Sequence, residues 1–389
     1  MFIRIVLLGI TILSFGVVPA VSAGYYSSID AREEMRYSPD FEIFGKVMDV
    51  LGTIPVPKPA SNPPIRQRYV FIESLAGDGT LKLETLEQKL NYSAVLIRRG
   101  RAFEAARFLG KVQIENPESF LVLSQYATAY FLSGDRDSER ESARVLKKSL
   151  EKWPKSWNDL KEDEKKFLTS FGWHEFDFDR YRRYEVLFER LMVNRLKEKR
   201  LQEKKQPVVE TVDPIFLDAK GEPIRFLNEK GEYEAGRIAA PDKEQMPRDS
   251  VEAVEQLLIW MPNDERLLWL LAETFNASAM EHQTKKGRSM AVLNANKIFQ
   301  RLLNFETPTK YGLKEITKRQ AVLQDYMDAN PVDAIELPVE EPNDVKMSRL
   351  QWWRTLAVAF ALGLAIGMFA LWQTQEMRRR RQARAAPGS

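Results

Sequence analysis

The sequence predicts a mainly α protein of stacked short helical hairpins, with a small β-meander insertion and one C-terminal transmembrane helix. Three observations predict this class. Apolar residues recur at helical spacing on both sides of a glycine turn in residues 91–117, and the same pattern returns in residues 119–154. Near the other end, residues 355–372 carry no charge over a length close to the thickness of a bilayer's hydrocarbon core.

Residues 1–23 have the composition of a secretory signal peptide. Arg4 precedes an apolar run at residues 5–18, and small residues lead to Ala23, after which we expect cleavage. The alternative is an uncleaved membrane anchor, which the short apolar run disfavours. Residues 24–64 then contain a short amphipathic piece and, at 54–64, a proline-rich linker that we expect to be extended.

Residues 65–205 form the main helical region. In its first hairpin, Gly100 permits the backbone conformation of a helix end, Ala105 is small where two helices should cross, and Pro117 closes the second helix. Residues 119–154 repeat this order, with Gly134 at the turn and Pro154 at the end. An insertion of about three residues after Gly134 makes this copy longer than the usual repeat.

The spacing of Gly100, Ala105, Leu109 and Pro117 resembles a tetratricopeptide repeat (TPR). The resemblance implies a stack of hairpins whose first helices line a concave surface that binds peptides or partner proteins. It also implies partner-binding residues at the matching positions, and we expect two of them, Arg98 and Gln125, to project without a role in helix packing. The positions are Asn91, Ala94, Arg98, Gln125 and Thr128.

Residues 206–249 interrupt the helical pattern. FLDAKGEP (216–223) recurs ten residues later as FLNEKGEY (226–233), and Gly221 and Gly231 supply the positive φ of tight hairpin turns. We therefore expect a small antiparallel meander. A second helical repeat region follows at 250–329, with a helix break at Pro262, a polar loop at 285–288 and a closing helix at 295–306.

The C-terminal part predicts a single membrane crossing. Residues 330–349 are an acidic linker that contains prolines, and residues 350–373 hold the transmembrane helix with tryptophans at both edges. Residues 374–389 carry five arginines and one acid, which favours a cytoplasmic tail. Together with the signal peptide, this predicts a bacterial inner-membrane protein whose body is extracytoplasmic. Ala359, Gly363 and Gly367 share one face of the helix and predict a homodimer through the membrane.

Composition argues against several functions. The net charge is +3, and much of that excess lies in the tail, so we expect no nucleic-acid partner. With 2 histidines and 0 cysteines, the chain lacks the parts of a histidine-based triad, a zinc site or disulfides, and we expect no cofactor. The acids around His174, in residues 173–185, could chelate a hard cation, but their aromatic neighbours favour the start of a packed helix.

The sequence therefore predicts a non-enzymatic, membrane-anchored scaffold that binds a protein or peptide partner on the extracytoplasmic face. Two alternatives stay open. One is an enzyme whose site lies in the meander or around His174, and the other is a passive spacer in an envelope complex.

Overall fold

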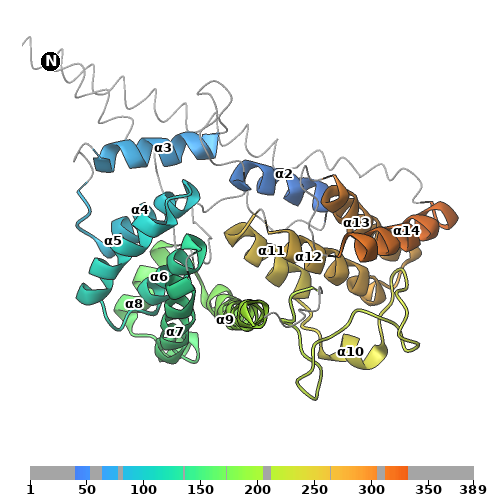
Figure 1. Ribbon diagram of the computed structural model, residues 1–389. Helices are drawn as coiled ribbons and strands as arrows, with labels where there is room; N and C mark the ends of the chain where they lie inside the picture. The colour runs from blue at the N-terminus through green and yellow to red at the C-terminus, as the bar shows by residue number, and fades with distance from the viewer. Residues whose placement is uncertain are drawn as a thin grey trace, which may run out of the picture. The chain divides into compact units, whose positions relative to one another are not determined.

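The computed structural model describes residues 40–52, 64–77, 82–134, 136–171, 173–204, 212–262, 264–304 and 312–331. All of them belong to the first of two compact units, which divide between residues 331 and 332. This part of the chain is mainly helical (Figure 1), which confirms the predicted class. Its helices are α2 (Phe41–Gly52), α3 (Pro64–Gly77), α4 (Leu86–Arg98), α5 (Ala102–Glu115), α6 (Phe120–Ser133), α7 (Arg136–Lys152), η3 (Trp157–Asp159), α8 (Glu162–Ser170), α9 (Glu175–Glu203), α10 (Ala240–Gln245), α11 (Ser250–Trp260), α12 (Glu265–Ser278), η4 (Ala279–Glu281), α13 (Lys285–Leu303) and α14 (Leu313–Ala329).

Two helical hairpins lie where the sequence predicts them, α4 with α5 and α6 with α7. Gly100 (φ 71°) and Gly134 (φ 78°) occupy the two turns in the left-handed region, where a side chain would be strained. Thr85 caps α4, because its hydroxyl accepts a hydrogen bond from the Gln88 N–H at 3.2 Å. Since α5 also contacts α6, the hairpins stack on each other as they do in helical-repeat folds.

Buried serines hold α7 against α6. Ser142 donates a hydrogen bond to the carbonyl of Ala127, and Ser149 donates one to the carbonyl of Phe120, each at 2.8 Å. Leu146 lies between the two serines in the same interface and is fully buried. The small hydroxyl side chains let the two helices approach closely, and their hydrogen bonds satisfy groups that burial would otherwise leave unpaired.

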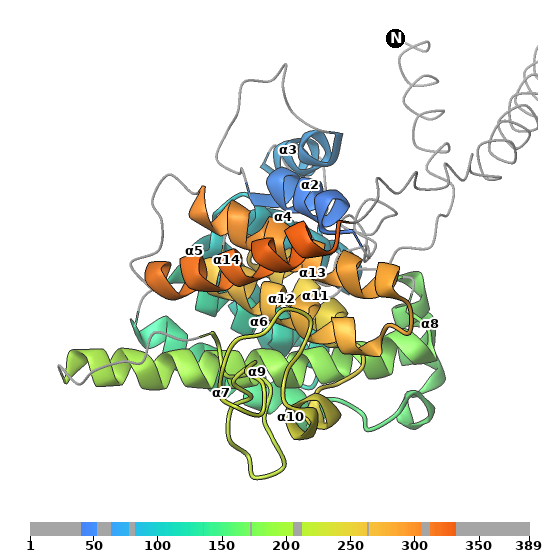
Figure 2. The same ribbon diagram turned by 90° about the vertical axis from the view of Figure 1, so that its right-hand side faces the viewer.

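The long helix α9 begins at the predicted place. The Asp177 carboxylate accepts a hydrogen bond from the His174 N–H at 3.3 Å and so caps the helix. An aromatic core then ties α9 to the end of α7, with the ring centroids of Trp153 lying 6.3 Å from Trp173 and 5.9 Å from Phe178. α9 contacts both α7 and α11, and Figure 2 shows its full length, which Figure 1 views nearly end-on.

Helices α11 to α14 lie in the second region predicted to be helical, and one of its predicted boundaries differs. α11 ends at Trp260, and α12 begins after Asp264, whose carboxylate caps it through the Leu267 N–H at 3.0 Å. The polar loop predicted at 285–288 is wrong, because α13 already begins there. The Thr284 hydroxyl accepts a hydrogen bond from the Gly287 N–H at 3.1 Å, and this cap starts the helix before its polar residues.

The predicted β-meander is wrong, although its two turns are present. Within residues 212–250 the structure has two isolated β-bridges and no strand. Gly221 (φ 81°) and Gly231 (φ 77°) adopt the expected turn conformation. In each turn a side-chain oxygen, from Asp218 or Asn228, accepts hydrogen bonds from the backbone N–H groups two and four residues later. These local bonds use the donors that a strand ladder would need.

The amphipathic piece before the first linker forms α2, which packs on α13. Phe41 and Phe44 are buried, and the Phe41 N–H donates to the side-chain oxygen of Asn294 at 3.3 Å. Arg301 of α13 forms an ion pair with Asp49 of α2. Residues from opposite ends of the described chain therefore share one part of the core.

None of the helices within the described ranges has both the length and the apolar character needed to cross a bilayer. Three predicted segments lie outside those ranges: the signal peptide (1–23), the transmembrane helix (350–373, with Ala359, Gly363 and Gly367) and the cytoplasmic tail (374–389). So does most of the acidic linker at 330–349.

Candidate functional site

The predicted partner-binding residues do not form an open surface. Asn91 is half-buried, and the other four are buried: Ala94, Arg98, Gln125 and Thr128. The Gln125 amide group donates hydrogen bonds to the Leu90 carbonyl and the Ser93 hydroxyl, each at 2.9 Å, so it ties α6 to α4. The expectation that Arg98 and Gln125 project without a packing role is therefore wrong. The role of the five residues in partner binding stays a prediction.

Helix α11 explains the burial of Arg98. The Arg98 guanidinium donates a buried hydrogen bond to the carbonyl of Ile259, at the C-terminal end of α11. In the same part of the fold, Phe188 of α9 meets Trp260 of α11 with ring centroids 4.9 Å apart. A helix of the second helical region thus contacts the end of α4 through Arg98 and packs against α9.

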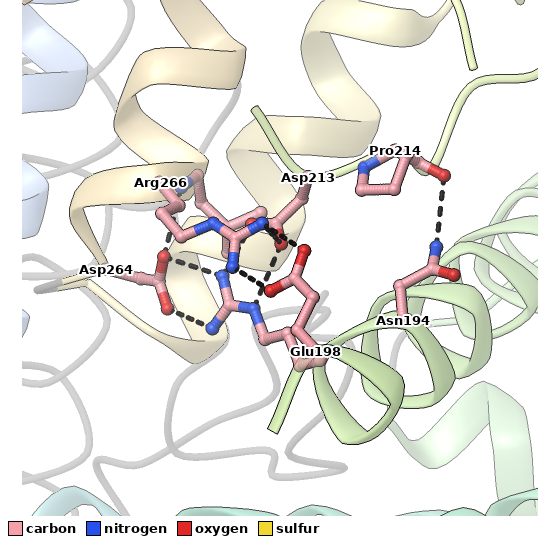
Figure 3. A network of polar contacts seen from close by, with 8 residues as sticks. Asn194, Glu198, Asp213, Pro214, Asp264 and Arg266 are labelled. Carbon is pink, nitrogen blue, oxygen red and sulfur yellow. Dashed lines mark hydrogen bonds and ion pairs between the residues drawn. The ribbon is translucent and has the colours of Figure 1, made fainter. Parts of the chain in front are cut away.

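A cluster of charges around the buried Asp213 joins the two helical regions, and we call it the Arg195 cluster (Figure 3). It brings together side chains from α9, from the segment that follows α9, and from the start of α12. Its members are Arg195, Glu198, Asp213, Asp264 and Arg266.

Arg195 lies at the centre of this cluster and binds two carboxylates at once. Its Nε and Nη2 donate to Asp213 at 3.1 and 2.6 Å, and Nη2 also donates to Asp264 at 2.8 Å. Arg266 lies 3.0 Å from Asp213 and donates to Glu198 at 3.0 Å. The side chain of Asp213 is 0% exposed, so two guanidinium groups replace the water that its charge would otherwise require.

The electrostatics of the cluster depend on Arg195. Burial acts to raise the pKa of Asp264, but the charge of Arg195 and the hydrogen bonds from Arg195 and the Leu267 N–H together hold that pKa below its ordinary value. In return the two aspartates raise the pKa of Arg195 against the effect of burial. The aspartate that caps α12 therefore stays ionised at neutral pH because a residue of α9 lies beside it.

Further hydrogen bonds attach the segment after Asp213 to α9. The Asn194 amide group donates to the Pro214 carbonyl at 3.1 Å (Figure 3), and Arg190 donates to the Ile215 carbonyl at 3.2 Å. Arg195 and Glu198 belong to a run of alternating charges at residues 195–205, a pattern typical of a solvated helix end, yet both lie inside this network.

A cavity of about 300 Å³ lies beside the Arg195 cluster. Its cations already have partners, since Lys199 pairs with Glu139 at 2.8 Å and the two arginines belong to the cluster. The cavity therefore offers no unpaired positive charge to an anion. Its lining consists of Phe131, Glu139, Arg195, Leu196, Glu198, Lys199, Gln202 and Arg266.

A second buried charge pair fixes the segment with the two turns. Glu273 of α12 is fully buried, forms an ion pair with Arg319 of α14, and accepts a hydrogen bond from the Trp269 indole at 2.7 Å. The Arg319 guanidinium also lies 4.7 Å from the ring centroid of Tyr233, in cation–π geometry. These contacts hold residues far apart in the sequence, which is why no local pattern predicted them.

Among the residues considered for metal binding, Asp177 has structural contacts. Asp177 caps α9 and pairs with Arg180 at 2.9 Å, so it supports the helix start. Across the described ranges, no group of three or more histidine, cysteine or acidic side chains is placed to hold a metal ion. Neither the protein-family models, nor the curated proteins, nor the solved structures compared with this chain match it.

Proposed function

We propose that this chain is a non-enzymatic, membrane-anchored scaffold whose TPR-like hairpins bind a protein or peptide partner on the extracytoplasmic face. The observation that carries the proposal is the outer face of the stacked hairpin α4–α5. Phe103 and Ile114 of α5 are 58% and 79% exposed, and they share that face. Large apolar side chains held in water on a rigid helix gain free energy when a partner covers them.

The membrane part of the proposal is supported by the sequence. Residues 1–23 and the charge-free stretch 355–372, followed by an arginine-rich tail, agree on one orientation in a bacterial inner membrane. We also propose, from the sequence pattern alone, that the chain self-associates through Ala359, Gly363 and Gly367.

A passive spacer is the second candidate. The hydrogen bond from Arg98 to Ile259 favours it, because it engages one of the side chains that the TPR resemblance implies for peptide binding. A body held together in this way could act by its rigidity and length alone.

Affinity purification separates the two candidates. The tagged full chain is solubilised from membranes of its own organism beside a tagged control that carries residues 350–389 only. The scaffold predicts one protein that is recovered with the full chain in near-equal amount and is absent from the control. If the full chain recovers no more protein than the control, the scaffold is excluded and the passive spacer is the remaining candidate.

A further inference from the structure

The exposed face of α5 carries positive charge as well as apolar side chains. Phe103, Arg107, Lys111 and Ile114 are all exposed, and their spacings of four, four and three residues place them on one helix face. The opposite face packs into the core. Figure 1 shows α5 at the edge of the described helices.

The charge on this face is not balanced by its own acids. Glu104 of α5 pairs with Arg101, and Glu115 pairs with Lys89 of α4. Arg107 and Lys111 form no ion pair with any described residue. The two acids of α5 are thus engaged by the cations that flank the helix, which leaves the middle of the face positive.

Tyr126 of α6 lies beside this face, against Gly110 of α5. A Cβ atom at Gly110 would approach the Tyr126 hydroxyl to 3.1 Å, so the missing side chain lets the tyrosine lie against α5. Tyr126 and Tyr130 have ring centroids 4.5 Å apart and share a hydrogen bond of 2.8 Å between their hydroxyls. Half-buried tyrosines in a fixed arrangement are typical of the centres of protein interfaces.

We propose that this face, defined by Phe103, Arg107, Lys111, Ile114 and Tyr126, binds a segment of a partner protein that carries acidic side chains next to apolar ones. The proposal rests on the scaffold function and names the chemistry of the partner. The apolar groups of that segment cover Phe103 and Ile114, and its carboxylates lie beside Arg107 and Lys111. At a rise of 1.5 Å per residue, the 11 positions between Phe103 and Ile114 span about 16 Å, the length of about five extended residues. The hydrogen-bonded tyrosine pair beside the face favours a protein segment over a flat lipid surface, because tyrosine is enriched in the cores of protein interfaces.

A selection from random peptides tests this proposal without assuming a partner sequence. The full chain, held in nanodiscs of phosphatidylcholine, is exposed to a displayed library of random peptides. We expect the recovered peptides to combine Asp or Glu with Leu or an aromatic residue. The double variant Arg107→Glu/Lys111→Glu should recover them about tenfold less well, because two attractive charges become repulsive.

The matched control is Lys220→Glu/Lys230→Glu, which makes the same change of charge at two exposed turn residues. It should recover the peptides as well as the unchanged chain does, and circular dichroism should show both variants folded. Three results would overturn the proposal: no enriched peptides, enriched peptides without acidic residues, or equal loss in the control. Binding to phosphatidylglycerol vesicles that is lost in Arg107→Glu/Lys111→Glu, with no peptide enriched, would assign the face to lipid instead.

The same variants distinguish failure of this surface from failure of the scaffold function. If Arg107→Glu/Lys111→Glu still recovers the membrane partner in full, the scaffold stands and this surface is wrong. If the unchanged chain recovers no partner from membranes, the scaffold function fails whatever the peptides show.

Discussion

Glu255 is a buried carboxyl group in the middle of α11. Glu255 is 1% exposed, and its Oε1 atom has no hydrogen-bond partner among the described residues. Burial, with a smaller contribution from the nearby charge of Glu252, raises the pKa of Glu255 well above its ordinary value. Because the folded-state pKa exceeds that of the unfolded chain, the stability linked to the protonated group is present at acid pH. It is lost as the pH rises through the folded-state pKa.

Glu255→Gln should therefore stabilise the protein near neutral pH, since the amide keeps the shape of the side chain and cannot ionise. We expect a gain of about 1 kcal/mol, or roughly 2–4 °C in melting temperature, at about pH 7.5, and no gain at about pH 4. The exposed Glu84→Gln serves as the control and should change neither value. A lower melting temperature for Glu255→Gln near neutral pH would show that the carboxylate has a partner.

Arg195→Met should destabilise the protein strongly, because it leaves Asp213 and Asp264 buried without their shared cation. Removal of one partner from a buried ion pair costs about 3–5 kcal/mol. Arg183→Met is the matched control on the same helix, since its pair with Asp249 leaves the arginine side chain 54% exposed, and it should cost below about 1 kcal/mol. Urea unfolding of both variants measures the difference, and equal costs would contradict a structural role for the cluster.

The burial and the partners of single residues were the features least predictable from the sequence. Helical spacing places Arg98 and Gln125 on first helices, but it does not show that α11 and α4 cover them. Arg195 looks like one more exposed cation in a charged run, because Asp264 lies 69 positions away and only the fold brings the two together. The acidic residues after His174 were predicted correctly as a helix start, since a cap involves neighbours in the sequence.

At the scale of elements, the start of helix α14 depends on Gly312, whose backbone lies close to the Trp269 ring. Gly312 has φ 71°, and a Cβ atom there would lie 2.5 Å from the Trp269 ring. Gly312→Ala should therefore cost more than backbone strain alone, by about 1–3 kcal/mol for the overpacked contact.

Gly221→Ala provides the comparison, because Gly221 has φ 81° with open space around it. It should cost only the strain of the left-handed conformation, about 1–2 kcal/mol. Thermal unfolding of the two variants checks this order, and an equal loss would show that Trp269 moves aside freely.

Elements set by local chemistry were predictable, and those set by competition between local and long-range bonds were not. Gly100 and Gly134 mark the hairpin turns correctly, because only glycine adopts that conformation without strain. The meander failed because Asp218 and Asn228 bind the backbone N–H groups of their own turns. The start of α13 was missed because a single cap at Thr284 outweighs the polar residues that follow it.

For the whole molecule, the orientation in the membrane is a prediction from the sequence that labelling can test. The chain has 0 cysteines, so one introduced cysteine reports one position. A cysteine after Arg384 should resist a membrane-impermeant thiol reagent in spheroplasts, whereas one at Ala334 in the acidic linker should react. Both should react after detergent treatment, and the opposite order in intact spheroplasts would reverse the topology.

The way the two helical regions fit together also belongs to the whole molecule. Contacts of α9 with α11, of α2 with α13, and the Arg195 cluster join segments that no sequence pattern connects. Since four of the five residues that the TPR resemblance implies for binding are buried, we look to an open surface with apolar side chains, the outer face of α5.

The most direct test of the scaffold is site-specific photo-crosslinking in native membranes. Phe103 is replaced by p-benzoylphenylalanine in the full chain, and the same residue replaces Lys220 in a control chain with the label on an exposed turn. The account predicts one crosslinked protein from position 103, absent from position 220 and lost when Arg107→Glu/Lys111→Glu is added. The same crosslinked bands from positions 103 and 220 would contradict it. So would the absence of a crosslinked protein both from position 103 and from a second label placed at Ile114.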